Sequence, residues 1–135
     1  MMPAAMRRRP LLALIAVAAA GGLAACGSQG VDVPASDAQV HRGATLFAER
    51  CAGCHSLDVA GAEGGALKIG DRERTDGPNF NVRRETKQSV LYAIRNGGFS
   101  GAIMPENIVV GEEAEAVAEF LAKYAGRDAE QPPAP

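Results

Sequence analysis

The chain has 135 residues, of which 47% are hydrophobic and 22% charged, with 14 basic and 16 acidic side chains and a formal net charge of −2. This length allows one small domain plus processing segments. The first 25 residues contain three arginines and no acid, so the remainder carries 11 basic and 16 acidic side chains, a net charge of −5. This negative net charge argues against a nucleic-acid-binding protein, because such proteins are usually basic.

Residues 1–25 have the layout of a secretory signal. Basic residues from Arg7 to Arg9 precede an apolar run that extends from Leu11 to Ala20, and small residues follow. This run is shorter than the roughly 20 residues that a membrane-spanning helix needs. We therefore predict a cleaved export signal, with an uncleaved membrane anchor as the alternative.

The tetrapeptide Leu23-Ala24-Ala25-Cys26 resembles a bacterial lipobox, in which cleavage precedes a cysteine that receives a lipid. Lipidation of Cys26 would account for the one cysteine that lies outside the Cys51–Cys54 pair. The stretch GSQGVDVPAS that follows has the composition of a linker. We predict that residues 26–36 form a lipidated cysteine and a flexible tether, which would hold the protein at the outer face of a bacterial membrane.

The predicted folding unit covers residues 37–126, and the proline-rich end at 127–135 is predicted to be a disordered tail. The first predicted helix starts at a capping-box pattern formed by Ser36 and Gln39 and runs into Cys51. Its apolar residues recur at helical spacing, which indicates one buried face: Val40, Ala44 and Phe47.

Two further helices are predicted in the second half of the chain. Thr86 is expected to cap the second, and Gly97 is expected to end it. The third starts near Gly111 with acidic residues close to its first turn, and its apolar positions are Val117, Phe120, Leu121 and Tyr124. Residues 56–84 are rich in glycine and charge and contain no convincing strand. The predicted class is therefore small and all-α.

The segment RCAGCHSL places Cys51, Cys54 and His55 within five positions. A thioredoxin-type redox pair would require a βαβ context, which the sequence does not suggest. A zinc site would require four ligands, and His41 would have to be the fourth. C-x-x-C-H is the attachment pattern of c-type haem, in which both thiols add to the vinyl groups and the histidine binds iron. One helical turn brings the two cysteines to the same edge of the haem macrocycle. The sequence therefore favours covalent haem over a redox pair or a zinc site, and the predicted export signal agrees with this interpretation.

Residues 38–125 resemble a class I bacterial cytochrome c domain. Five segments of this family occur here in order: HRGATLFAERCAGCH, DGPNF, SVLYAIRNGG, IMPEN and EAEAVAEFLAKYAG. The resemblance implies three main helices around one covalent haem c. It also implies that the carbonyl of Pro78 accepts a hydrogen bond from the ring of His55, with Asn79 and Phe80 at the haem edge. Gly43 and Phe47 would meet the last helix.

Met104 is the candidate for the sixth iron ligand, because the other methionines lie in the predicted signal. A lone methionine often fills a core, but Met104 precedes Pro105 in a loop, which favours a ligand. His41 is the rival. It begins the helix that leads to Cys51, so it is poorly placed to reach the opposite haem face, and we expect it to be exposed.

These features predict a single-electron carrier, not an enzyme. Its expected partners are redox proteins such as a terminal oxidase or a quinol–cytochrome c reductase, with the membrane contacted through lipid and no nucleic acid bound. The alternative is an electron-accepting cytochrome c subunit of a periplasmic dehydrogenase or oxidase. A haem enzyme or gas sensor would need an open iron site, and Met104 argues against one. A basic stretch could steer docking onto an acidic partner, or could be ordinary solvated surface: Arg72, Arg74, Arg83, Arg84, Lys87 and Arg95.

Overall fold

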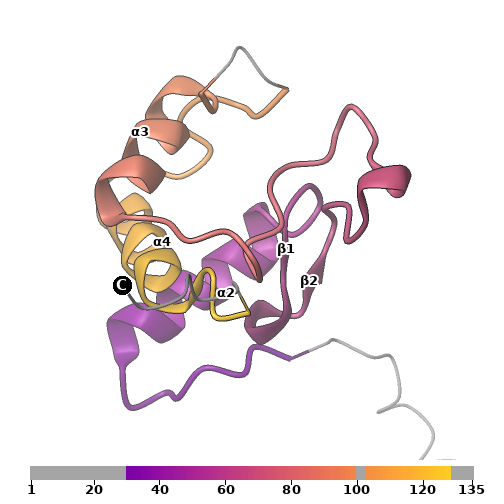
Figure 1. Ribbon diagram of the computed structural model, residues 1–135. Coiled ribbons are helices and arrows are strands. Elements are labelled where there is room, and N and C mark those ends of the chain that lie inside the picture. Colours follow the sequence, from indigo (N-terminus) through magenta and orange to yellow (C-terminus); the bar gives the residue numbers. More distant parts are fainter. Residues whose placement is uncertain (1–29, 100–102, 129–135) are drawn as a thin grey trace, which may run out of the picture.

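The computed structural model describes residues 30–99 and 103–128. Within them the main elements are the helices α2 (Ala38–Arg50), α3 (Lys87–Asn96) and α4 (Gly111–Tyr124). Between α2 and α3 lie the short strands β1 (Ser56–Leu57) and β2 (Ala62–Glu63) and the 3-10 turns η1 (Asp58–Ala60) and η2 (Ile69–Asp71). Figure 1 shows α2 and α3 both beside α4, and the strands beside the end of α2. The mainly helical architecture confirms the all-α prediction.

The helices α2 and α4 approach each other closely at Gly43. A Cβ at this position would lie 2.8 Å from Cβ of Phe120 and would overlap the carbonyl of Ala116. Next to this contact the rings of Phe47 and Phe120 pack with their centroids 5.8 Å apart, and both side chains are almost completely buried. The prediction that Gly43 and Phe47 meet the last helix is therefore confirmed.

The ends of the helices follow local capping chemistry. Thr86 and Ser89 form a reciprocal capping box at the start of α3, and Gly97 ends that helix in the left-handed conformation, as predicted. The expected cap at Ser36 is wrong. Asp37 caps α2 instead, because its carboxylate accepts a hydrogen bond from the backbone N–H of Val40. Aspartate is as good an N-cap as serine, so the pattern left two adjacent candidates.

The absence of strands was also predicted wrongly. Ser56 and Leu57 pair with Glu63 and Ala62 in an antiparallel register, and η1 connects the two strands. Each strand has only two residues, which is too short for an alternating pattern to be visible in the sequence. The buried hydroxyl of Ser56 also donates to the carbonyl of Gly65 and accepts from its N–H, which extends the pairing.

The N-terminal strap, residues 31–37, corrects the prediction of a flexible tether over 26–36 for the part that the structure describes. Val33 is only 5% exposed and belongs to the core, and the N–H of Asp32 donates to the carbonyl of Val59 in η1. The expected exposure of His41 is wrong for the same reason. This residue is half-buried, and its ring Nδ1 donates to the carbonyl of Val33 at 2.8 Å. Residues 1–29, including Cys26, lie outside the described part of the chain.

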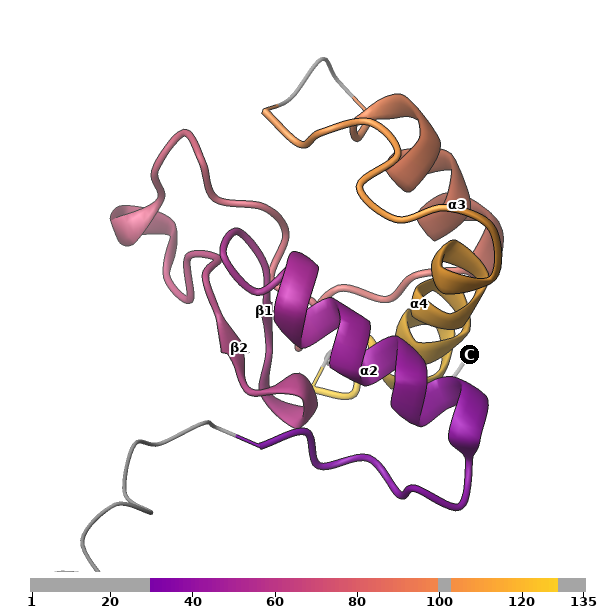
Figure 2. The same ribbon diagram turned by 180° about the vertical axis from the view of Figure 1, so that it is seen from behind.

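The C-terminal end of the domain extends past the predicted boundary at residue 126. The N–H of Asp128 donates to the carbonyl of Asn81, and the guanidinium of Arg127 lies 3.9 Å from the ring centroid of Tyr124. These two residues therefore belong to the folded part, whereas the rest of the predicted tail, 129–135, lies outside the described residues. In Figure 2 the end of α4 and the strap lie on the same side of the domain.

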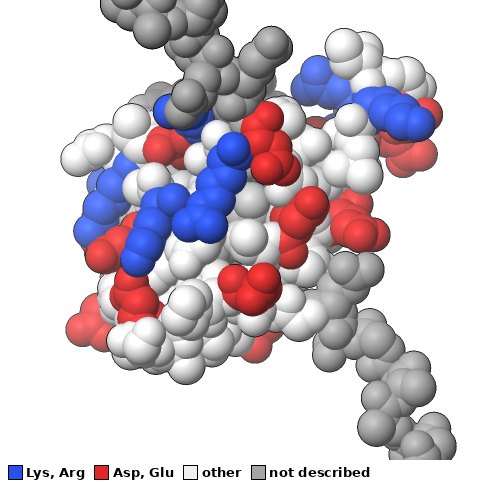
Figure 3. Space-filling model, turned by 60° about the horizontal axis from the view of Figure 1, so that its bottom comes forward, with Lys and Arg blue, Asp and Glu red and all other residues white. Residues whose placement is uncertain are grey.

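The surface carries basic and acidic side chains close together, as Figure 3 shows for one face. Arg42 of α2 lies 3.8 Å from each of Glu112 and Glu113 of α4, and Lys123 of α4 donates to Asp37 at 2.6 Å. These pairs are solvent-exposed and contribute little to the free energy of unfolding. No helix within residues 30–99 and 103–128 is both long and apolar enough to cross a membrane.

Substitution Gly43→Ala should destabilise the haem-loaded protein by about 1–3 kcal/mol, because the new methyl overlaps the backbone of α4. Denaturant unfolding measures this change. Gly70→Ala is the matched control, since a Cβ there meets no atom within 4 Å, and it should change the free energy of unfolding little. Equal stability of the two variants would contradict the proposed close helix contact.

Candidate functional site

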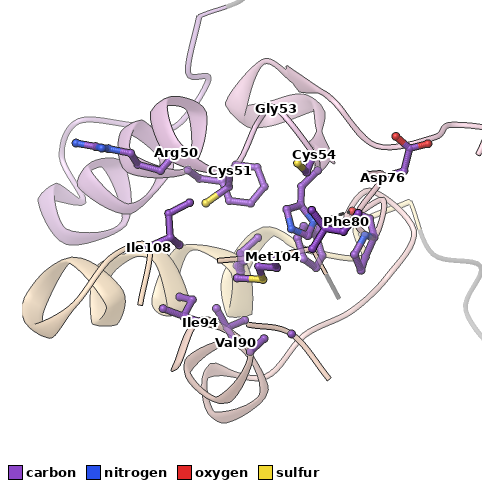
Figure 4. Close-up of a pocket in the computed structure, with 18 of the residues that line it drawn as sticks. Arg50, Cys51, Gly53, Cys54, Asp76, Phe80, Val90, Ile94, Met104 and Ile108 are labelled. Carbon is purple, nitrogen blue, oxygen red and sulfur yellow. Dashed lines mark hydrogen bonds between the residues drawn. The ribbon is translucent and has the colours of Figure 1, made fainter. Parts of the chain in front are cut away.

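A cavity of about 310 Å³ opens between the end of α2, α3 and the segment that precedes α4. This is within the size range of small-molecule and cofactor sites, roughly 300–1,000 Å³. Its walls come from all three helices and are largely apolar: Phe47, Val90, Ile94, Ile108, Val117 and Leu121. Figure 4 shows Cys51 and Met104 at this pocket, contributed by segments that are far apart in the sequence. The pocket is thus an apolar slot with sulfur atoms in its lining.

Cys51 and Cys54 line the cavity as free thiols, the first half-buried and the second exposed. The N–H groups of Cys54 and His55 both donate to the carbonyl of Cys51, so the turn after α2 is tightly wound. Burial, and secondarily the neighbouring Cys54, raises the pKa of Cys51 to about 12. Both thiols are therefore presented from one turn to one pocket, which is the arrangement that two thioether bonds to a single ligand require.

The ring of His55 is fixed by the segment that contains Gly77 and Pro78. Its Nδ1 donates to the carbonyl of Pro78 at 3.2 Å, so the hydrogen bond that the sequence suggested is present. Because Nδ1 carries the proton, Nε2 retains its lone pair for a metal. Gly77 permits this approach, since a Cβ there would overlap the imidazole. Burial lowers the pKa of His55 below its usual value, although the hydrogen bond to Pro78 opposes this shift. Burial therefore favours the neutral ring, which is the form that can bind a metal.

Met104 is half-buried, packs against the core and lines the same cavity as Cys51 and His55. The turn that carries it is attached to the end of α3: the N–H of Asn107 donates to the carbonyl of Ile94. A Cβ at Gly97 would lie 2.8 Å from the carbonyl oxygen of Met104. The structure therefore brings the proposed sixth ligand to the pocket by packing its loop against the left-handed cap of α3.

Two described residues considered from the sequence, His41 and Asn79, are not part of the lining of this cavity. His41 is absent from its lining and binds the strap through Val33. Cys26 lies outside the described residues. Within the described ranges no three His, Cys, Asp or Glu side chains gather as a metal-ligand cluster, so the four ligands of the zinc alternative are not assembled there.

Residues 40–125, more than half of the chain, match the family model of cytochrome c. The chain belongs to the cytochrome c family. Comparisons with curated proteins and with solved structures gave no match. The fold, with its three helices and small sheet, agrees with a small class I cytochrome c.

The cofactor follows from the family and from the donors in the cavity. An apolar pocket with two free thiols and a neutral imidazole fits covalent haem c, and the C-x-x-C-H motif of this cytochrome provides all three groups. The prediction of one covalent haem c is confirmed. The protein is an electron-transfer protein, and as such it has redox partners.

Several residues of the pocket were not identified from the sequence. Gly77 precedes the proline of DGPNF, and this position in the motif was the one available signal for its contact with the imidazole. Arg83 and Glu85 form an ion pair of 2.6 Å at the pocket wall, and the Glu85 side chain is only 7% exposed. No sequence pattern marked that pair.

The basic stretch does not form one surface. Arg72, Arg74 and Arg83 line the cavity. By contrast, Lys87 makes ion pairs with Glu115 and Glu119 of α4. The basic groups near the pocket are therefore only part of the set that the sequence suggested.

Replacement of both Cys51 and Cys54 by alanine should leave haem held only by non-covalent contacts. Acidic acetone should then extract the haem from the double variant, whereas the wild-type protein and each single variant should retain it through a remaining thioether. Absorbance of the solvent phase measures the extracted haem. Complete extraction from the wild-type protein would contradict covalent attachment.

Proposed function

We propose that this cytochrome is a lipid-anchored, monohaem single-electron carrier with His55 and Met104 as the two axial ligands. The observation that carries this proposal is that Met104 and His55 line one cavity although 49 positions separate them in the sequence. When bound, the haem supplies a one-electron couple. His55 and Met104 would occupy both axial positions, which leaves no site for a substrate and raises the reduction potential.

Substitution Met104→Ala should abolish the weak long-wavelength charge-transfer band that sulfur ligation gives to ferric haem. The reduction potential should fall, because the thioether that favours the ferrous state is lost. His41→Ala is the control, since its ring binds the strap and does not line the cavity. An unchanged spectrum in Met104→Ala, or loss of the band in His41→Ala, would refute the ligand assignment.

The proposed anchor rests on Cys26 in the tetrapeptide LAAC, after a basic segment and a short apolar run. The strap changes how such an anchor would act. Because Val31 and Val33 pack against the domain, only residues 27–30 remain between Cys26 and the folded part. A chain of this length reaches at most about 18 Å. An anchor at Cys26 would thus keep the domain close to the lipid surface and would restrict its range.

The point at which the chain enters the domain also bears on its orientation. In Figures 1 and 2 the strap enters at the bottom, beside η1, whereas the loops around residues 72–75 and 103–105 lie at the top. These two loops contribute Arg72, Arg74, Ile103 and Met104 to the cavity. A short connection at the opposite end would favour a domain whose pocket faces away from the membrane and is open to a partner.

Substitution Cys26→Ser should prevent lipid labelling and should block cleavage after Ala25, because lipobox cleavage depends on the cysteine that receives the lipid. Metabolic labelling with a radioactive fatty acid measures the first effect, and the size of the protein on a denaturing gel measures the second. If the variant is still processed after Ala25 and fractionates with the membranes as the wild-type protein does, the lipid anchor is wrong, and a bound protein retains the chain.

The proposed partners are a terminal oxidase or a quinol–cytochrome c reductase, either of which exchanges single electrons with a small carrier. Two arginines at the cavity, Arg72 and Arg74, support docking onto an acidic surface, whereas Arg83 is paired with Glu85. Stable co-purification of a larger catalytic chain would instead favour an electron-accepting subunit of a periplasmic dehydrogenase or oxidase.

A further inference from the structure

The imidazole of His55 is held by an aromatic clamp in addition to its hydrogen bond. The ring of Phe80 stacks on it, with the centroids 4.9 Å apart and an angle of 18° between the planes. The ring of Phe47 lies near both, at 6.2 Å from His55 and 5.9 Å from Phe80. We call these three residues the aromatic clamp. Two of them come from α2 and the turn that follows it, and the third comes from the loop after Pro78.

Phe80 is itself strongly constrained, which makes it a firm support for the imidazole. Its side chain is 7% exposed, and its N–H donates to the carbonyl of Ser56 at 2.8 Å. Its carbonyl accepts a hydrogen bond from the N–H of Gly126 at 2.7 Å, which ties this loop to the segment after α4. The backbone of Phe80 is therefore attached to β1 and to the C-terminal end of the domain, and its ring is enclosed by the core.

A single hydrogen bond does not fix the plane of a histidine ring. The terminal torsion of histidine has broad minima, so neighbouring atoms decide its value. The bond from Nδ1 to the carbonyl of Pro78 restrains one ring atom, whereas a stacked ring restrains the whole plane. A stacked aromatic contact stabilises the pair beyond the burial of area, which favours one orientation of the imidazole within that broad minimum.

We propose that Phe80 is a positioning residue that sets the orientation of the axial imidazole plane of His55, and with it the electronic structure of the ferric site. This inference rests on His55 as an iron ligand. The direction of an axial imidazole plane governs how the unpaired electron of low-spin ferric haem is distributed over the macrocycle. Phe80 would act through His55 and would not itself contact iron.

The test compares Phe80→Leu with Phe120→Leu in the haem-loaded cytochrome. Leucine preserves an apolar side chain but provides no ring face to stack on the imidazole. Phe120 is fully buried and packs against Phe47 at 5.8 Å, but it makes no ring contact with His55, so its loss controls for a loosened core. Phe80→Tyr retains the ring face and tests rescue.

The readouts are the haem-methyl NMR shifts and the g-values of the ferric protein, measured after the wild-type protein has shown a low-spin histidine-ligated spectrum. That first measurement tests ligation by His55 separately from the clamp. We expect Phe80→Leu to redistribute the methyl shifts, whereas Phe120→Leu and Phe80→Tyr should preserve the wild-type order.

Two results would overturn the proposal. One is a wild-type shift pattern in Phe80→Leu, and the other is the same redistribution in Phe120→Leu, which would indicate general loosening of the core. If Phe80→Leu does not mature, Phe80→Met serves in its place, since it also provides apolar volume without a ring face, and the same criteria apply to it.

Discussion

The backbone of α2 lies against the carbonyl of Ala116 in α4, and Gly43 is the residue that makes this approach possible. The position of the binding motif depends on this crossing, because α2 ends at Arg50 and delivers Cys51 directly to the pocket. From the other side of the crossing, α4 contributes Val117 and Leu121 to the cavity wall. The contact between α2 and α4 thus positions both the thiols for haem attachment and the apolar wall of the cavity.

Phe47 connects this helix crossing to His55, the proposed iron ligand. Its ring packs against Phe120 on α4 and also against both His55 and Phe80. Because protein interiors are densely packed, Phe47 joins the helix crossing to the rings that surround the imidazole. Burial of this cluster lowers the pKa of His55, which favours the neutral form of its ring. The same aromatic residues therefore pack the core and surround the imidazole of His55.

The two ends of the folded part are attached to the same body as the pocket. The strap is held by Val59 and by His41, and the segment after α4 is held by Phe80 and Asn81. Both attachments use backbone groups paired with residues that are distant in the sequence. The folded unit consequently starts earlier and ends later than composition suggested, and this shortens the connection that a lipid at Cys26 would have.

The sequence alone was sufficient for the elements whose signals are local. The C-x-x-C-H motif specified covalent haem, because its spacing places two thiols on one turn, and the amphipathic patterns located all three helices. Met104 was singled out by its place beside Pro105 in the loop, and the structure brings it to the same cavity as His55.

Tertiary structure decided the features that depend on distant neighbours. Pairing of β1 with β2, burial of Val33 in the strap, the Arg83–Glu85 pair and the stack of Phe80 on His55 all join residues that no periodicity relates. Short strands and single buried side chains have no repeating pattern, so their environment is created only when the helices pack. The sequence therefore indicated the thiols and the imidazole of the C-x-x-C-H motif, and the packing decided which neighbours surround these groups at the pocket.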